Sequence, residues 1–313
     1  MGVVWGFGTS AVDLRIVTAD YGEGYKDKLL AQKIFRMGGG STSNFLVQVS
    51  KLGFRSGLLS KLGRDGVGLE IVRMLKAENV DCSGIILDDN AVSPFNVAVY
   101  AGENKRRVGG FLLPNCLAEI TEDELAVLAQ KVQPGDYVLV EIGEIPIPTC
   151  LAFCGLLRER QAKIVMDVDL DPVRQCGSDP GTVRALLDCA DYLMPNITSL
   201  ASLYPSGTVE EITEDLAKRH HCVAVTTLGA KGAAYSVSGE KAVIVPTIKI
   251  TPVDTVGAGD AFHGGFIAGL SAGKGLEDAI LLGNVCGAHV CLAFGIRDVM
   301  LTAAELEKYN VRI

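Results

Sequence analysis

The stretch that decides the fold reads DTVGAGDAFHGGF and covers residues 254–266. Two carboxylates, Asp254 and Asp260, bracket two glycines, and the chain then continues into small and apolar residues with helical potential. Small residues let a backbone approach a ligand closely. The first N–H groups of a helix lack intrahelical partners and lie at the positive end of its dipole. The stretch therefore predicts an anion-binding cradle at a helix start, with Asp260 in the first turn as a base.

Glycine-rich stretches by themselves more often mark turns or close packing than phosphate sites. This one is more specific, because its glycines are paired with two carboxylates at a helix start. The chain contains no G-x-x-x-x-G-K-[ST] loop, so a Walker A site is excluded. An anion cradle beside a fixed base is the arrangement that phosphoryl transfer requires.

Length and composition indicate a large α/β domain. The chain has 313 residues, of which 48% are hydrophobic, so it can bury a sizeable core. Its apolar runs are too short for a membrane span, and its N-terminus shows no basic region or cleavage site, so we expect no signal peptide. The net charge of −8 argues against a nucleic-acid partner.

The nine cysteines are scattered through apolar segments, and their number is odd. With four histidines and no C-x-x-C spacing, a metal cluster is not expected. Buried thiols in a reducing cytoplasm are the better interpretation.

Strands and helices alternate along most of the chain. We expect buried strands at 1–8, 56–62, 137–141, 163–167, 192–194 and 222–226. Helical spacing follows Gly40, with Gly53 as its stop, and capping boxes begin helices at Thr121 and Thr302. This order predicts a doubly wound, mostly parallel sheet covered on both faces, in three layers. Ligands bind beyond the carboxyl ends of such strands, where the chain places Asp13, Gly39, Glu141, Asp167, Asn196, Thr227 and Asp260.

The segment 254–260 resembles the second signature of the ribokinase-like (PfkB) carbohydrate kinase family, usually D-T-x-G-A-G-D. Residues 39–44, with G-G-x-x-x-N, and residues 63–68, with G-x-D-x-x-G, match the two halves of its first signature. The resemblance extends over essentially the whole chain in the family's order. It implies a single ribokinase-like domain over 1–313, with ATP and Mg²⁺ as cofactors and a small sugar as substrate.

The resemblance also implies roles for individual residues. Asp260 resembles the general base, and Gly257, Ala258 and Gly259 would offer backbone N–H groups to the transferred phosphate. Sugar hydroxyls would be bound by Asp13, Gly39, Gly40, Asn44 and Glu141. The nucleotide would contact Asn196, Thr227, Gly229, Gly232 and Asn284. A monovalent cation, for which potassium is the natural choice, would be held by Asp254, Val256, Cys291 and Gly295.

From the residues alone, blander interpretations stay open at several positions. Without the resemblance, Asn44 is better interpreted as an early-helix polar residue and Asp13 as a turn former, and a helix-surface amide accounts for Asn284 nearly as well. His263 is better interpreted as a packed or surface histidine than as a reacting group.

One position departs from the family's pattern. The usual N-x-x-E appears as Asn196 followed by Ser199, so the Glu that organises Mg²⁺ through water is missing. The acidic run at 167–171 offers Asp167 and Asp169 in its place, although such a run is also an ordinary solvated loop. This run looks closer to the ketohexokinase and sulfofructose kinase branches, which slightly favours a ketose substrate.

Two stretches, roughly 12–36 and 94–113, alternate between polar and apolar residues and break the rhythm of strands and helices. In the family such strands form a lid over the sugar site and a dimer contact, so the resemblance implies a homodimer. The alternative is an extra antiparallel edge on the main sheet. Within the lid, Lys105, Arg106 and Arg107 would contact an anionic substrate or simply be solvated.

Three rival functions remain at this point. A nucleoside kinase shares the fold and signatures, and Tyr21, Tyr25 and Phe95 could stack a base. A non-catalytic sugar or nucleotide sensor is suggested by Ser199. An NAD-dependent oxidoreductase is suggested by Gly6 and Gly8, but the third glycine of that fingerprint is missing.

Overall fold

A nine-stranded sheet runs through the computed structural model, which describes residues 2–19, 30–102, 106–111, 115–199 and 202–313. Its order is β13-β12-β11-β10-β9-β8-β1-β4-β5. Neighbours from β5 to β11 pair in parallel, whereas β12 and β13 are antiparallel. The strands are β1 (Val4–Phe7), β4 (Ser56–Gly63), β5 (Asp81–Asp88), β8 (Tyr137–Ile142), β9 (Lys163–Val168), β10 (Tyr192–Pro195), β11 (Val223–Thr227), β12 (Ala233–Val237) and β13 (Val243–Val245).

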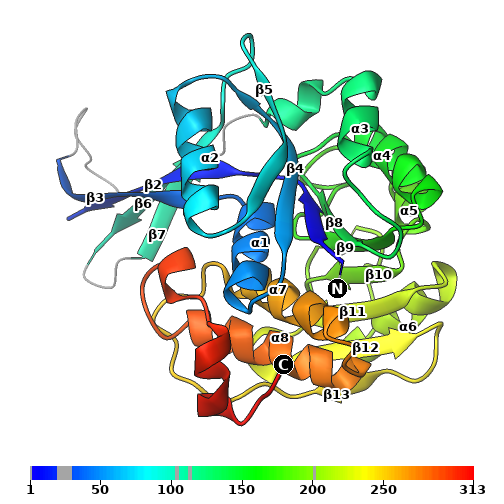
Figure 1. Ribbon diagram of the computed structural model, residues 1–313. Coiled ribbons are helices and arrows are strands. Elements are labelled where there is room, and N and C mark those ends of the chain that lie inside the picture. Colours follow the sequence, from blue (N-terminus) through cyan, green and yellow to red (C-terminus); the bar gives the residue numbers. More distant parts are fainter. Residues whose placement is uncertain (1, 20–29, 103–105, 112–114, 200–201) are drawn as a thin grey trace.

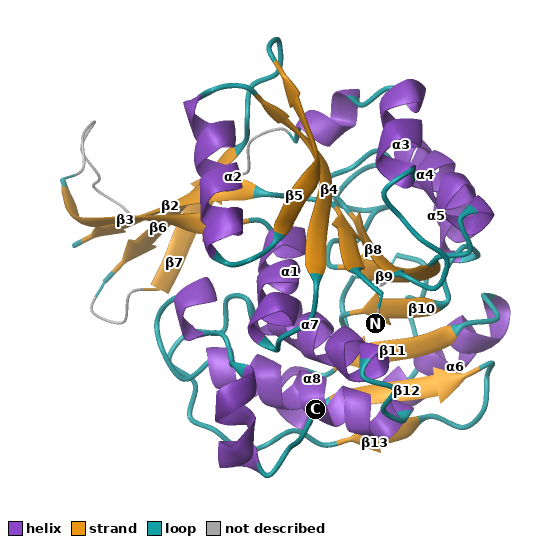
Figure 2. Cartoon of the chain, in the orientation of Figure 1, coloured by secondary structure: helices purple, strands orange, loops and turns teal. Residues whose placement is uncertain are grey.

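Helices cover both faces of this sheet (Figure 2). Alternate residues of one strand enter different cores: Val165 of β9 packs in one, and Ile164 and Met166 pack in the other. The first core contains residues of α1 (Ser41–Lys51), α2 (Gly66–Ala77), α7 (Ala258–Ser271) and α8 (Leu276–Val290). The second contains residues of α3 (Glu122–Ala129), α4 (Ile147–Glu159), α5 (Pro180–Leu187) and α6 (Val209–Arg219). The predicted three-layer, doubly wound fold is confirmed.

Local sequence explains where several helices begin and end. Thr121 and Thr208 each close a capping box at the start of α3 and α6. Gly53, which follows α1, has a φ of 88°, a conformation that suits glycine at a helix end. The capping box at Thr302 is also present, but it begins a 3₁₀ helix at Ala303–Tyr309.

Three strands escaped the sequence analysis. The strand β5 is interrupted by polar residues and glycine (DCSGIILD), and it lies at an edge of the sheet. The strands β12 and β13 form an antiparallel extension at the opposite edge, where no helix intervenes to mark the alternation. Edge strands carry a weaker apolar pattern because they are less completely buried.

A second, four-stranded sheet projects from one end of the main body (Figure 1). Its order is β3-β2-β6-β7, with β2 (Ala11–Thr18), β3 (Ala31–Gly39), β6 (Phe95–Ala101) and β7 (Arg106–Phe111). These strands lie in or next to the two stretches that break the rhythm. They form a sheet of their own, so the alternative of an extra edge on the main sheet is wrong. We call this sheet the small sheet.

In the part of the chain that the structure describes, every helix is too short or too polar to cross a lipid bilayer.

Candidate active site

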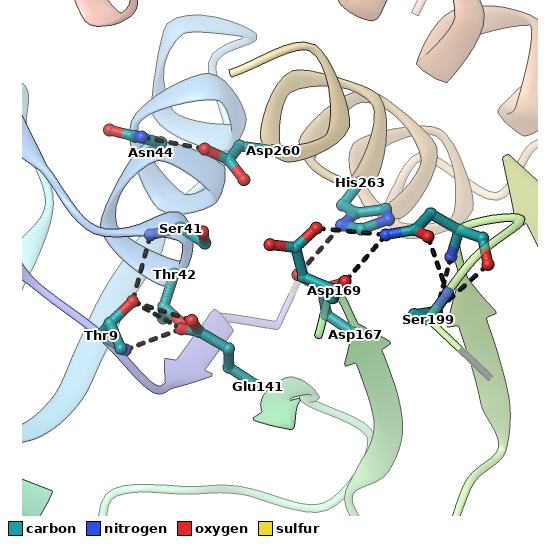
Figure 3. A network of polar contacts seen from close by, with 11 residues as sticks. Thr9, Ser41, Thr42, Asn44, Glu141, Asp167, Asp169, Ser199, Asp260 and His263 are labelled. Carbon is teal, nitrogen blue, oxygen red and sulfur yellow. Dashed lines mark hydrogen bonds and ion pairs between the residues drawn. The ribbon is translucent and has the colours of Figure 1, made fainter. Parts of the chain in front are cut away.

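Polar residues gather where the parallel strands end and where α1 and α7 begin (Figure 3). The parallel sheet explains this, because the carboxyl ends of its strands meet at one edge. Six of these residues belong to parallel strands or follow closely after them. They are Thr9, after β1, Glu141 of β8, Asp167 and Asp169, at the end of β9, Asn196, after β10, and Thr227 of β11. Asp260 reaches the same region from the first turn of α7.

Asp260 has a carboxylate with a raised pKa. Its Oδ2 accepts a hydrogen bond of 2.9 Å from Asn44 Nδ2. Burial raises the pKa of Asp260 to about 7, and the charge of Asp167 acts in the same direction, while the hydrogen bond from Asn44 opposes it. A carboxylate with such a pKa can act as a general base at physiological pH.

Arg297 holds Asn44 from the other side. Its Nε donates to Asn44 Oδ1 at 2.9 Å, and its Nη2 donates to the Gly39 carbonyl at 2.8 Å. The residue is only 6% exposed, and burial lowers its pKa to about 10. The sequence analysis missed Arg297, because no local pattern marks a lone arginine whose partners lie far away in the chain.

The glycines at 39 and 40 allow the close approach that the motif predicts. A Cβ on Gly39 would overlap the carboxylate of Asp13, whose Oδ1 accepts a hydrogen bond of 3.1 Å from Asn96. Gly40 is the N-cap of α1 with a φ of 89°. The structure therefore brings Asp13, Gly39, Gly40 and Asn44 close together beside Asp260. Their contact with a sugar stays a prediction.

Glu141 is bonded to the protein itself. Its carboxylate accepts hydrogen bonds from Thr9 N at 2.7 Å, from Thr9 Oγ1 at 2.8 Å and from Thr42 Oγ1 at 2.6 Å. The residue is 5% exposed, and burial raises its pKa. These bonds join the loop after β1 to the start of α1. A direct sugar contact by Glu141 stays a prediction.

Glu144, which the sequence analysis did not single out, is half-buried beside the same group of acids. Burial raises its pKa to about 7, and the charges of Glu141, Asp169 and Asp13 add to the effect. A carboxyl group that is partly protonated at neutral pH can donate a hydrogen bond to a hydroxyl.

His263 is packed, as expected. It lies one helical turn after Asp260, and its Nδ1 is 3.4 Å from Asp167 Oδ2, with both side chains nearly inaccessible. Burial alone would lower the pKa of His263, but the charge and hydrogen bond of Asp167, together with the charges of Asp260 and Asp169, outweigh it and the pKa is raised.

Ser199 closes a turn. Its Oγ accepts from the Asn196 N–H at 3.1 Å, and its own N–H donates to Asn196 Oδ1 at 2.9 Å. The other end of the Asn196 side chain donates to the Asp169 carbonyl at 2.9 Å. Asn196 and Asp169 therefore lie together, and a serine stands where the resemblance implied a carboxylate.

These residues suit a magnesium ion that is held mainly by phosphate and water. Among the residues that the structure describes, no three His, Cys, Asp or Glu side chains form a metal cage. Mg²⁺ usually keeps several waters and takes only one or two carboxylates besides substrate phosphates. Asp169 stands directly after β9, and partial loss of water together with the charge of Asp167 raises its pKa. A nearby cation would relieve that repulsion, so the residues fit such a role.

A cavity of about 470 Å³ opens beside the start of α7. It is bounded by the loop after β11, the segment 247–255, and the helices α7 and α8. Its lining includes Thr227, Gly229, Gly232, Thr247, Ala258, Gly259, Phe262, Asn284, Gly287 and Cys291. A largely apolar cavity of this size with a few polar groups is typical of a small-ligand site.

Four of the five predicted nucleotide residues line this cavity, namely Thr227, Gly229, Gly232 and Asn284, whereas Asn196 lies outside its lining. Gly232 has a φ of 99°, and a Cβ there would overlap the Val245 carbonyl. Asn284 is 4% exposed and donates to that carbonyl at 2.9 Å, so the interpretation as a helix-surface amide is wrong. Asn284 thus holds the segment that closes one wall.

The start of α7 has the backbone shape that the motif predicts. Gly257 is its N-cap with a φ of 84°, and a Cβ there would lie 2.6 Å from Ile296 Cγ2. Ala258 and Gly259 line the cavity. The first turn of this 14-residue helix therefore lies beside the cavity and also carries Asp260.

At the predicted cation site, Asp254 contacts an arginine. Asp254 Oδ2 lies 3.2 Å from Arg15 Nη1, and Asp254 Oδ1 accepts from the Val256 N–H at 3.1 Å. The Cys291 carbonyl accepts from the Val253 N–H at 2.8 Å. These contacts engage two of the groups that the resemblance assigned to potassium, the Asp254 carboxylate and the Cys291 carbonyl, and the guanidinium beside them makes the site a poor fit for that ion.

The two glycines that suggested an NAD site have a packing role. Gly6 and Gly8 pack against Thr42 of α1, where a Cβ would collide, so close packing accounts for both glycines. Phe95 is half-buried on β6. Tyr21, Tyr25 and Lys105 lie outside the described residues, as do the side chains of Arg106 and Arg107.

Comparisons with known proteins show the family of the chain. Residues 5–303 match the sequence profile described as pfkB family carbohydrate kinase. Ribokinase of Bacillus subtilis is 27% identical over 306 residues, covering 96% of this chain and 97% of that protein. Fructokinase-1 of Zea mays is 26% identical over 280 residues, covering 86% of each.

Among solved structures, Arabidopsis thaliana ribokinase complexed with ribose and ATP has a TM-score of 0.81 at 21% identity, covering 98% of both chains. This likeness supports the fold, and the profile match spans nearly the entire sequence. The chain belongs to the pfkB family of carbohydrate kinases, which are phosphotransferases with an alcohol group as acceptor.

Proposed function

We propose that this chain is an ATP-dependent sugar kinase that transfers the γ-phosphoryl group to a hydroxyl of a small carbohydrate. The observation that carries the proposal is the placement of Asp260. This carboxylate, with a pKa raised to about 7, lies at the start of α7 between a nucleotide-sized cavity and a cluster of polar groups.

The reaction is a direct displacement. The sugar is bound by Asp13, the backbone at Gly39 and Gly40, and Asn44, with one hydroxyl aimed at Asp260. As that hydroxyl oxygen bonds to the γ-phosphorus, the bond from this phosphorus to the bridging oxygen breaks, and ADP leaves with the electron pair. Asp260 accepts the hydroxyl proton, and first-turn N–H groups of α7 stabilise the charge on the phosphoryl oxygens.

Mg²⁺ neutralises charge on the ATP phosphates in kinases, and Asp169, with Asn196 beside it, would bind water of that ion here. Potassium is the second ion that the resemblance implied. The Asp254 carboxylate that would bind it already contacts Arg15.

The small sheet acts as a lid in this proposal. It supplies Asp13 and Gly39 directly, from β2 and β3. Closing it over the sugar would exclude water and so favour transfer to the sugar over hydrolysis of ATP. We further propose a homodimer formed through this sheet and a cytoplasmic location, which the nine free cysteines support.

A substrate screen for ADP release tests the activity. The panel contains ketohexoses, aldopentoses, aldohexoses, anionic sugars and nucleosides, with Asp260→Asn as the inactive control. We expect sugar-dependent ADP release with a slight preference for a ketose, and none from the control. Faster turnover of nucleosides would favour the nucleoside kinase. Binding of ATP and a sugar by calorimetry without ADP release from any compound would favour the non-catalytic sensor.

A further inference from the structure

Arg15 lies where the family resemblance places a monovalent cation. It belongs to β2 of the small sheet, yet it is only 1% exposed, and its Nη1 is 3.2 Å from Asp254 Oδ2. Asp254 begins the loop that ends at Gly257, the N-cap of α7. Because an unpaired charge away from water is costly, a buried arginine and its carboxylate hold one another in place.

Two aromatic rings enclose the guanidinium group. Its central carbon lies 5.3 Å from the ring centre of Phe294 and 6.0 Å from that of Tyr100. Phe294 is part of the loop that follows α8, next to Gly295, and Tyr100 lies on β6. Aromatic faces attract cations, and more strongly where water is excluded. Arg15 therefore bridges the loop before α7 and the loop after α8, the two loops expected to bind the ion.

The Asp254 carboxylate and the Cys291 carbonyl are already engaged. One Asp254 oxygen faces Arg15, and the other accepts the Val256 N–H at 3.1 Å. The Cys291 carbonyl accepts N–H groups of Val253 at 2.8 Å and Asp254 at 3.4 Å. Beside Gly295, a Cβ would meet the methyl groups of Val299 at 3.7 and 3.9 Å, so this side of the loop is apolar. A second cation here would also be repelled by the guanidinium.

We propose that Arg15 replaces the monovalent cation as the fixed positive charge beside the phosphate cradle, so that this kinase needs no potassium. Arg15 is a positioning residue: it acts through Asp254 to hold residues 254–257 in the shape that aims the first N–H groups of α7. The inference rests on the proposed kinase function. It also explains why an arginine from the small sheet is buried against the main body.

The test compares the wild-type protein with Arg15→Met and Arg15→Lys in KCl, NaCl and choline chloride at equal ionic strength. Two readouts are used: sugar-dependent ADP release, and the melting temperature without substrates. Arg219→Met is the matched control, because Arg219 is an exposed arginine on α6 whose partner Asp215 lies on the same helix, away from the cradle.

We expect the wild-type protein, Arg15→Lys and the control to show the same activity and melting temperature in all three salts. Arg15→Met should lose about 100-fold in kcat/KM in choline chloride, since small misplacements of a reacting group cost that much. Potassium or dilute guanidinium chloride should raise kcat/KM of Arg15→Met at least tenfold. The same additions should raise the melting temperature of this variant and of no other.

Several results would overturn the proposal. These are activation of the wild-type protein by potassium, full activity of Arg15→Met in choline chloride, or a folded Arg15→Met that no cation rescues. If Arg15→Met does not fold, Arg15→Lys becomes the test. Activity of Arg15→Lys without potassium supports the role of the positive charge, and loss of that activity contradicts it. If no sugar is phosphorylated, the kinase function fails, but the melting temperatures still test Arg15.

Discussion

At the residue scale, Asp260 determines how the activity should depend on pH. Only the ionised carboxylate can accept the hydroxyl proton, and burial raises its pKa to about 7. We therefore expect kcat/KM for the sugar to be constant above this pH and to fall about tenfold for each unit below it. A pH–rate profile measures this directly, and a rate that stays constant down to pH 5 would contradict the assignment.

His263 gives this prediction a second test. The positive charge of His263 lowers the pKa of Asp260, and its loss would also free the negative charge of Asp167. Both effects favour the protonated form of Asp260, so His263→Gln should move the acidic limb of the profile to higher pH. A shift to lower pH would show that another group controls the profile.

Arg297 should matter for sugar binding and stability, although it is not expected to touch the transferred phosphate. In Arg297→Met, Asn44 Oδ1 and the Gly39 carbonyl lose their buried donor. Each unsatisfied group costs about 1–3 kcal/mol, so thermal unfolding should occur at lower temperature and KM for the sugar should rise. Calorimetry should show unchanged ATP affinity.

Arg64→Met is the control for this substitution. The Arg64 side chain is 52% exposed and pairs with Asp89 at 2.8 Å, a surface pair worth about 0–1 kcal/mol. If Arg297→Met and Arg64→Met raised KM for the sugar equally, Arg297 would have no specific role in sugar binding.

These residues also separate what local sequence predicts from what it does not. Asp260 and its glycines were predictable because the motif is contiguous and its chemistry acts within one helical turn. Arg297 and Asn44 are 253 residues apart, and Arg15 and Asp254 are 239 apart. Their pairing depends on how the small sheet and the loop after α8 pack together, which no periodicity along the chain records.

At the element scale, the start of α7 depends on the backbone of Gly257. Its φ of 84° is unfavourable for any residue with a side chain. In addition, a Cβ at this position would lie only 2.6 Å from Ile296 Cγ2. Gly257→Ala should therefore cost at least about 1–2 kcal/mol of stability and lower kcat, because the first N–H groups would no longer aim at the phosphate. Chemical denaturation and steady-state kinetics measure the two effects.

Gly259 provides the comparison within the same helix. A Cβ there has no atom within 4 Å, and alanine in a helix is favoured over glycine by about 0.5–1 kcal/mol. Gly259→Ala should keep or raise the stability, while its methyl group enters the cavity and raises KM for ATP. If the two variants unfold alike, the positive φ of Gly257 does not limit the helix start.

The same contrast explains the pattern of predicted and missed strands. The strands of the sheet centre, such as β8 and β9, are buried on both faces and read as continuous apolar runs. The edge strands β5 and β13 are half-exposed, so their sequences resemble loops. The sequence left open whether the small sheet is separate from the main sheet. Alternation indicates a strand, but it does not indicate which strands pair with it.

At the scale of the whole molecule, the small sheet presents apolar side chains at its two edge strands. Ile34 on β3 is 64% exposed and Phe111 on β7 is 71% exposed. Leu30, just before β3, is 89% exposed. Leu30 and Ile34 lie at the β3 edge, and exposed apolar groups at the edge of a projecting element suit a protein interface. A second copy of this chain is the partner that we propose.

A charge on this sheet should therefore separate the copies. We expect light scattering with size-exclusion chromatography to give twice the mass of one chain for the wild-type protein and a single-chain mass for Ile34→Asp. Val127→Asp, at a 51% exposed position on α3, is the control and should stay dimeric. Because β2 and β3 also carry Asp13 and Gly39, the separated chain should bind sugar more weakly but keep its ATP affinity. A wild-type protein that elutes as a single chain would show that the lid works without a partner.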